Sequence, residues 1–125
     1  MGCKVLVADD EACITHVVAR KFQNAGLEVI VAMDGCEAYE RATAERPDFL
    51  VTDLQMPGMS GLELCARLTA ELPEPIPTIL LTAKGFEIDR DRVRDLPILH
   101  VMTKPFSPRE LLANVQHALG IGAPR

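Results

Sequence analysis

The residue of greatest chemical interest in this 125-residue chain is Asp53, which directly follows the run Phe49-Leu50-Val51-Thr52. A carboxylate at the end of a buried strand loses hydration, which costs free energy unless a nearby group compensates it. Polar residues also follow the other apolar runs, and these are Asp9, Asp10, Thr82 and Lys104. Three carboxylates, a hydroxyl and an ammonium at strand ends are the components of a metal-assisted phosphoryl-transfer site.

The carboxylates of Asp9, Asp10 and Asp53 would repel one another if they met, so a proton or a cation has to neutralise them. The single ammonium of Lys104 cannot balance three negative charges. A hard divalent cation with oxygen ligands can, and Mg²⁺ suits this set. We expect Asp10 and Asp53 to coordinate Mg²⁺ directly, Asp9 to act through water, and the backbone carbonyl of Gln55 to complete the protein ligands.

The expected catalytic residues are Asp53, Thr82 and Lys104. A carboxylate just past a rigid strand can attack phosphorus and form an acyl phosphate. Lys104 and Mg²⁺ would neutralise the charge on the transferred group, while the Thr82 hydroxyl would donate to another of its oxygens. The product adds negative charge at the strand ends, so movement of Thr82 toward it would shift the following loop.

Length and composition favour one cytoplasmic domain, residues 1–120, followed by a tail at 121–125 that is either a terminus or the start of a linker. Hydrophobic residues make up 48% of the chain, which is typical of a globular protein. The formal net charge of −5 argues against direct binding to nucleic acid or to anionic membranes. We find no signal peptide and no apolar run of the ~20 residues that a membrane helix needs.

The four cysteines show neither a Cys-x-x-Cys pair nor a zinc-binding spacing, so we interpret them as small buried residues in a reducing compartment. They are Cys3, Cys13, Cys36 and Cys65.

Short β-rich runs alternate along the chain with helical patterns. The predicted strands are Lys4–Ala8, Glu28–Ala32, Asp48–Asp53, Ile79–Thr82 and Ile98–Met102. The predicted helices are Glu11–Ala25, Glu37–Glu45, Gly61–Leu72, Glu87–Leu96 and Pro108–Leu119. This alternation predicts an α/β fold with a parallel sheet and helices on both faces. Ligands of such sheets bind beyond the carboxyl ends of the strands, which is where the polar residues above are expected to meet.

The chain resembles the receiver domain of two-component response regulators, the CheY-like family, over essentially its whole length. The motifs that carry the resemblance are Asp9-Asp10-Glu11, Asp53-Leu54-Gln55-Met56-Pro57-Gly58-Met59-Ser60-Gly61, Thr82-Ala83 and Lys104-Pro105-Phe106. The resemblance implies a flavodoxin-like three-layer sandwich with strand order 2-1-3-4-5. It also implies that Asp53 accepts a phosphoryl group from a phosphohistidine on a sensor histidine kinase or histidine phosphotransfer protein.

By the same resemblance, Asp9 and Asp10 are the acidic pair, Thr82 is the switch hydroxyl and Lys104 contacts the phosphate. A cis bond between Lys104 and Pro105 is also implied, as is a position beside the phosphate for Gln55 and Lys84. The domain would catalyse only its own phosphorylation and dephosphorylation, so it would not be an enzyme acting on external substrates. It would switch its binding to a downstream effector protein or to a second copy of itself.

Two features depart from the family pattern. Val101 stands where the family carries Tyr or Phe, so we expect the output to work without rotation of an aromatic ring. The predicted helix Glu87–Leu96 is crowded with charges and has a poor apolar face, and we expect it to be loosely held.

Alternative functions of the same residues stay open. One is a docking scaffold of the same fold that is never phosphorylated. A less favoured one is an aspartyl-phosphate phosphatase, which would place a second Asp two residues after its nucleophile and would need a substrate-capping insertion. A flavin-binding protein is excluded, because the Asp9-Asp10-Glu11 stretch would repel the flavin phosphate.

Overall fold

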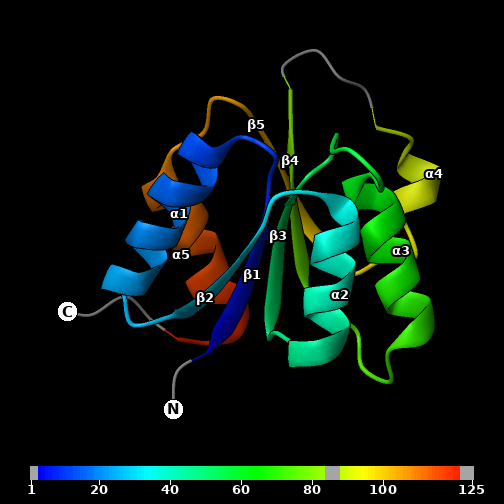
Figure 1. The fold of residues 1–125 in the computed structure, drawn as a ribbon, viewed down its shortest axis with the longest axis horizontal. Coiled ribbons are helices and arrows are strands. Elements are labelled where there is room, and N and C mark those ends of the chain that lie inside the picture. The colour runs from blue at the N-terminus through cyan, green and yellow to red at the C-terminus, as the bar shows by residue number, and fades with distance from the viewer. Residues whose placement is uncertain (1–2, 84–87, 122–125) are drawn as a thin grey trace.

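The computed structural model describes residues 3–83 and 88–121 and has a five-stranded parallel sheet at its centre (Figure 1). The strand order is β2-β1-β3-β4-β5, which confirms the predicted flavodoxin-like order. The strands are β1 (Lys4–Ala8), β2 (Glu28–Ala32), β3 (Phe49–Asp53), β4 (Thr78–Thr82) and β5 (Ile98–Thr103). The helices are α1 (Ala12–Asn24), α2 (Gly35–Glu45), α3 (Gly61–Glu71), α4 (Arg90–Val93) and α5 (Pro108–Leu119).

The two faces of the sheet carry separate cores because side chains alternate along each strand. In β1, Val5 and Val7 pack on one face with Phe22 of α1, and this core extends to α5. Leu6 packs on the opposite face with Leu64 of α3, in a core that also includes α2. Figure 1 shows the resulting layers, with α1 and α5 on one side of the sheet and α2 and α3 on the other. These paired cores hold the strand ends, and therefore the candidate site, in a fixed arrangement.

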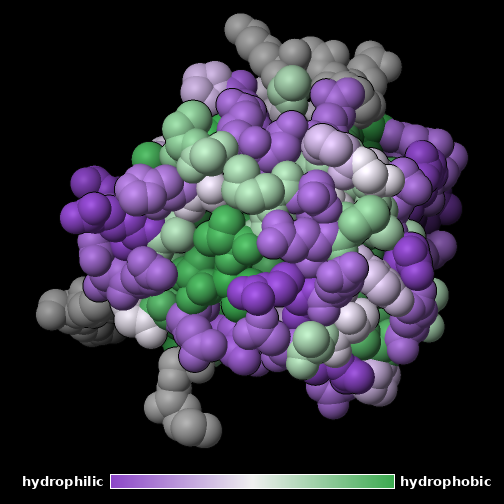
Figure 2. Space-filling view, viewed as in Figure 1, coloured by the Kyte–Doolittle hydropathy of each residue, from purple (hydrophilic) through white to green (hydrophobic). Residues whose placement is uncertain are grey.

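The surface in the view of Figure 2 is mostly hydrophilic, as expected for a chain with one charged residue in four. An apolar area lies in the region between α1 and α2, where β2 forms an edge of the sheet. Among the described helices, none is long and apolar enough to cross a membrane.

Local hydrogen bonds decide where the well-formed helices begin. The Asp34 carboxylate accepts from the backbone N–H of Glu37 at 2.8 Å, so α2 begins at Gly35 and not at the predicted Glu37. Ser60 and Glu63 form a capping box at the start of α3. Ser107 caps α5, as predicted. The remaining element ends, apart from those of the fourth helix, agree with the prediction or differ from it by one residue, within the usual fraying of helix and strand ends.

The fourth helix is much shorter than predicted, since α4 spans Arg90–Val93 where Glu87–Leu96 was expected. Asp89 caps it by accepting from the backbone N–H of Asp91 at 2.9 Å, and none of its residues is buried. Its one apolar residue, Val93, is only partly buried against a core cluster. The helix therefore gains little from packing, which is why the prediction was wrong about its length. Lys84 and Glu87 lie outside the described residues.

The interpretation of all four cysteines as buried was wrong for two of them. Cys65 of α3 is buried and Cys3 is partly buried, whereas Cys13 and Cys36 are exposed. The exposed pair lies in the first turns of α1 and α2. All four are free thiols.

Candidate functional site

The polar residues that follow β1, β3 and β5 meet at the carboxyl edge of the sheet. Ala8 pairs with Thr52 in the β1–β3 register, so the residues that follow on the two strands lie side by side. β4 continues this edge, because the backbone N–H of Leu54 donates to Leu81 at 2.7 Å. The N–H of Lys104 donates to the carbonyl of Thr82 at 2.8 Å, which brings the end of β5 to the same rim.

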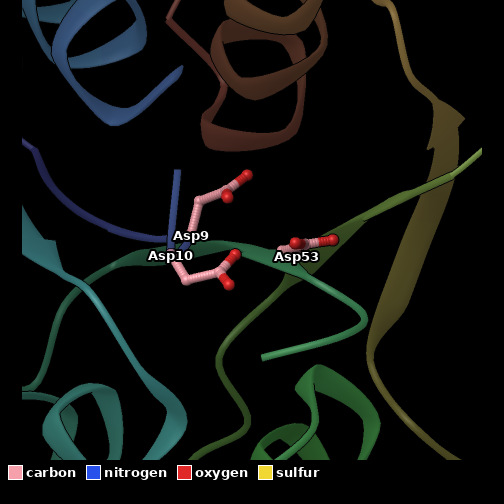
Figure 3. A group of neighbouring side chains, drawn as sticks. All are labelled: Asp9, Asp10 and Asp53. Carbon is pink, nitrogen blue, oxygen red and sulfur yellow. The ribbon is translucent and has the colours of Figure 1, made fainter. Parts of the chain in front are cut away.

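Asp9, Asp10 and Asp53 form an acidic cluster, in which one carboxylate oxygen from each lies within 4.8 Å of the others (Figure 3). Asp9 is fully buried and Asp53 is 7% exposed, whereas Asp10 is open to solvent. The predicted convergence of these three side chains is therefore present in the fold.

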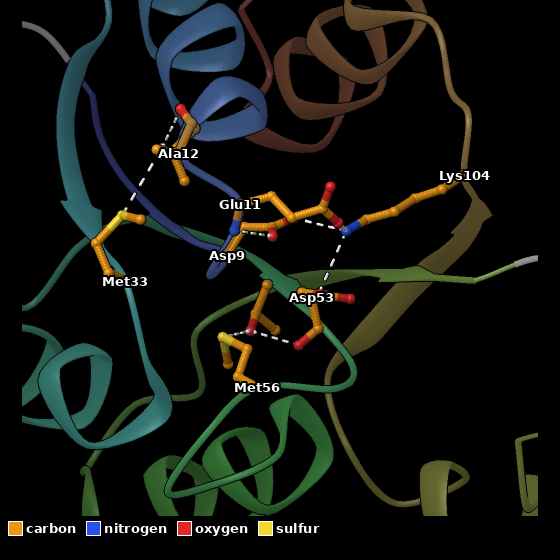
Figure 4. Close-up of polar contacts among 9 residues, drawn as sticks. Asp9, Glu11, Ala12, Met33, Asp53, Met56 and Lys104 are labelled. Carbon is orange, nitrogen blue, oxygen red and sulfur yellow. Dashed lines mark hydrogen bonds and ion pairs between the residues drawn. The ribbon is translucent and has the colours of Figure 1, made fainter.

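The Lys104 ammonium lies among carboxylates from two other elements (Figure 4). Its Nζ is 2.9 Å from Asp9 Oδ2, 3.0 Å from Glu11 Oε1 and 3.3 Å from Asp53 Oδ2. The contacts with Glu11 and Asp53 are hydrogen bonds, while the contact with Asp9 is an ion pair without hydrogen-bond geometry. Sequence reasoning gave Glu11 no role in the site, although its place directly after Asp9 and Asp10 was an available signal.

The pKa values of Asp53 and Lys104 are both raised above their ordinary values, for different reasons. Burial, followed by the negative charge of Asp9, raises the pKa of Asp53 above its ordinary value, and Lys104 and the Gln55 backbone amide oppose the rise. Burial lowers the pKa of Lys104, but its contacts with Asp9 and Glu11 and the charge of Asp53 outweigh this and raise it well above normal. Lys104 therefore stays protonated, and added positive charge would favour the ionised form of Asp53.

The two remaining residues expected in the site are Thr82 and Gln55. Thr82 is buried at the end of β4, and its hydroxyl donates to the carbonyl of Ala83 at 3.4 Å. It makes no hydrogen bond to Asp53 within residues 3–83 and 88–121. The Gln55 side chain is exposed, and the role of its carbonyl as a metal ligand stays a prediction.

The turn after Asp53 is fixed by a close backbone approach. The N–H of Gly61 donates to the carbonyl of Leu54 at 2.8 Å. A Cβ at position 61 would lie 2.2 Å from the carbonyl oxygen of Asp53, so only glycine fits here. The bond between Lys104 and Pro105 is cis, as the resemblance implied.

The donor set of the acidic cluster fits a hard divalent cation. All its side-chain donors are carboxylate oxygens, which Mg²⁺ prefers. Asp9 Oδ2 is buried and has no hydrogen-bond partner in the described part of the chain, although the Lys104 ammonium lies 2.9 Å away as an ion pair. An oxygen with unused acceptor capacity beside two other carboxylates is an expected ligand for a cation or for water held by one.

The chain is similar to known proteins over nearly its whole length. The response regulator receiver domain family matches residues 5–116. The alkaline phosphatase synthesis transcriptional regulatory protein PhoP of Bacillus subtilis is 40% identical over 95% of this chain and 49% of its own length. The phosphate regulon transcriptional regulatory protein PhoB of Pseudomonas aeruginosa is 38% identical over 95% of this chain and 52% of its own length. The chain thus spans about half the length of these curated relatives.

Solved structures show the same fold. The receiver domain of the response regulator AraT from Geobacillus stearothermophilus is 34% identical, with a TM-score of 0.81 over 96% of this chain and 97% of that one. The receiver domain of the Francisella response regulator 1452 is 32% identical, with a TM-score of 0.82 over 93% and 95% of the two chains. Because the family match spans residues 5–116, the chain belongs to the response regulator receiver domain family.

Proposed function

We propose that this receiver domain accepts a phosphoryl group on Asp53. The observation that carries the proposal is the meeting of Asp53 with Asp9, Asp10 and the Lys104 ammonium at one edge of the sheet. The cluster combines a nucleophile, a cation that neutralises an incoming anion, and carboxylates that fit a divalent metal.

In the proposed reaction, an oxygen lone pair of Asp53 forms a bond to phosphorus while the P–N bond of a phosphohistidine breaks. The electron pair of the broken bond stays on the imidazole nitrogen of the donor. Lys104 neutralises charge on the transferred group, and the backbone turn held by Gly61 keeps Asp53 at the open rim. Asp10, Asp53 and the carbonyl of Gln55 would hold Mg²⁺, with Asp9 acting through water. The metal would supply positive charge that favours ionised Asp53 and stabilises the transferred phosphoryl group.

The donor we propose is a sensor histidine kinase or a histidine phosphotransfer protein, and the reaction is limited to the domain's own phosphoryl group. The phosphorylated site would draw the hydroxyl of Thr82 toward it and shift the segment after β4, changing contacts with an effector protein or a second copy. Val101, at the family's aromatic position, is 44% exposed and has no ring to rotate. The proposed output therefore depends on the movement of Thr82 and not on an aromatic switch. The domain itself would work in the cytoplasm without contacting nucleic acid.

Acetyl phosphate and Mg²⁺ provide the direct test, with intact-protein mass as the readout. The wild-type domain is expected to gain one phosphoryl group, and Asp53→Asn is expected to gain none. Asp34→Asn is the matched control: it makes the same change at the cap of α2, where an amide oxygen can still accept from Glu37. An unmodified wild-type domain would favour the docking-scaffold function. Equal modification of the wild type and Asp53→Asn would place the phosphoryl group elsewhere.

A further inference from the structure

Glu11 occupies the N-cap position of α1 but does not cap the helix with its side chain. Its backbone is well anchored: its carbonyl accepts from Ile14 and Thr15, and its N–H donates to Asp9 Oδ1 at 2.9 Å. Its side chain instead reaches Lys104, 93 positions further along the chain. A cap position that prefers short polar residues thus carries a longer side chain with a different contact.

The three carboxylates around the Lys104 ammonium differ in how easily they can release it. Asp9 is fully buried, and its other oxygen is held by the backbone of Glu11. The side chain of Asp53 is 9% exposed and is the proposed phosphorylation site. The side chain of Glu11 is 54% exposed, so water can solvate its carboxylate once the contact is broken. Breaking the contact of Lys104 with Glu11 should therefore cost less free energy than breaking its contact with Asp9 or Asp53.

We propose that Glu11 is a positioning residue that holds Lys104 in the unphosphorylated domain and competes with the phosphoryl group for its ammonium. This inference rests on the proposed phosphorylation of Asp53. The Lys104 ammonium donates hydrogen bonds to Glu11 and Asp53 and forms an ion pair with Asp9. An incoming phosphoryl oxygen therefore competes with these carboxylates for the ammonium. Release of Glu11 frees one N–H donor of Lys104 for a phosphoryl oxygen.

The inference predicts that removing the Glu11 carboxylate strengthens phosphoryl binding. We expect Glu11→Gln to bind beryllofluoride, a phosphoryl mimic, about two- to fivefold more tightly at saturating Mg²⁺, as expected for loss of an exposed ion pair. Glu11→Asp is the matched control for charge: it keeps the negative charge but is one methylene too short to reach Lys104. If the contact matters, Glu11→Asp also binds the mimic more tightly. Dissociation constants come from amide chemical shifts in titrations of the whole domain.

The double substitution with Lys104→Met separates the contact from a general electrostatic effect. In that background Glu11→Gln is expected to change beryllofluoride binding little, because the ammonium for which it competes is gone. The role of Glu11 is overturned if Glu11→Gln matches the wild type, if Glu11→Asp matches the wild type, or if the gain persists with Lys104→Met.

Failure of the inference can be told apart from failure of the proposed function. If the wild-type domain neither binds beryllofluoride nor accepts the phosphoryl group of acetyl phosphate, both proposals fall. If it does both, and Glu11→Gln behaves identically, only the role of Glu11 is lost.

Discussion

Asp10→Asn removes a carboxylate from the acidic cluster without breaking an ion pair within the described residues, since Lys104 contacts Asp9, Glu11 and Asp53. Asp10 is exposed, so the amide is readily accommodated. The substitution therefore isolates the repulsion among the three carboxylates. We expect it to stabilise the domain when no divalent cation is present.

The size of the effect follows from the spacing of the cluster. Two like charges 4.8 Å apart repel by about 0.9 kcal/mol in a water-like dielectric. The repulsion between Asp10 and its sequence neighbour Asp9 is largely present in the unfolded chain too, so only the repulsion with Asp53 counts toward folding. The attraction of Asp10 to the ammonium of Lys104 offsets part of it, and the net gain expected for Asp10→Asn is about 0.5 kcal/mol, or roughly 2 °C in Tm for a domain of this size.

In saturating Mg²⁺ the wild type should instead be more stable than Asp10→Asn. Binding to the folded state alone adds about 2.7 kcal/mol at a metal concentration of one hundred times Kd. Asp10→Asn lacks one of the expected direct ligands, so it should gain less than the wild type. The variant is then more stable in chelator, and the wild type is more stable in saturating Mg²⁺.

Thermal unfolding in chelator and in Mg²⁺ measures both effects. Glu74→Gln is the matched control, because it removes the same charge between α3 and β4, away from the carboxyl edge of the sheet. Its response to Mg²⁺ should equal that of the wild type. The reasoning is refuted if Asp10→Asn is destabilised in chelator, or if Mg²⁺ stabilises wild type and variant by the same amount.

Two further predictions concern the surroundings of the site. Gly61→Ala should lose about 1–3 kcal/mol in urea unfolding, because its Cβ would lie 2.2 Å from the Asp53 carbonyl oxygen; unchanged stability would contradict the close approach. Burial raises the pKa of the Cys65 thiol, so iodoacetamide should label Cys13 and Cys36 well before Cys65 as pH rises, because the thiolate is the reactive form. Since the folded-state pKa of Cys65 is the higher one, any stability linked to this thiol is present below the unfolded pKa and lost at alkaline pH. Peptide mass spectra report the labelling, and equal rates for Cys13 and Cys65 would show that Cys65 is not protected.

Much of the fold follows from patterns local in the sequence. The apolar runs and the helical periodicities predicted the five strands and the parallel sheet, because burial of both sheet faces demands such runs. The boundaries that depend on a nearby cap, such as Ser107 before α5, were also predictable. The placement of Asp53 at a strand end followed from the same patterns, and so did its convergence with Asp9 and Asp10.

The sequence by itself determined which elements form and which polar residues reach the carboxyl edge, because both depend on local periodicity and on the general geometry of parallel sheets. Tertiary packing alone decided that α4 is a single short turn, that Cys13 faces solvent, and that Glu11 meets Lys104. These outcomes depend on which side chains face one another across elements far apart in the chain. The ion pair between Glu11 and Lys104 joins the start of α1 to the end of β5, and no local pattern specifies that meeting.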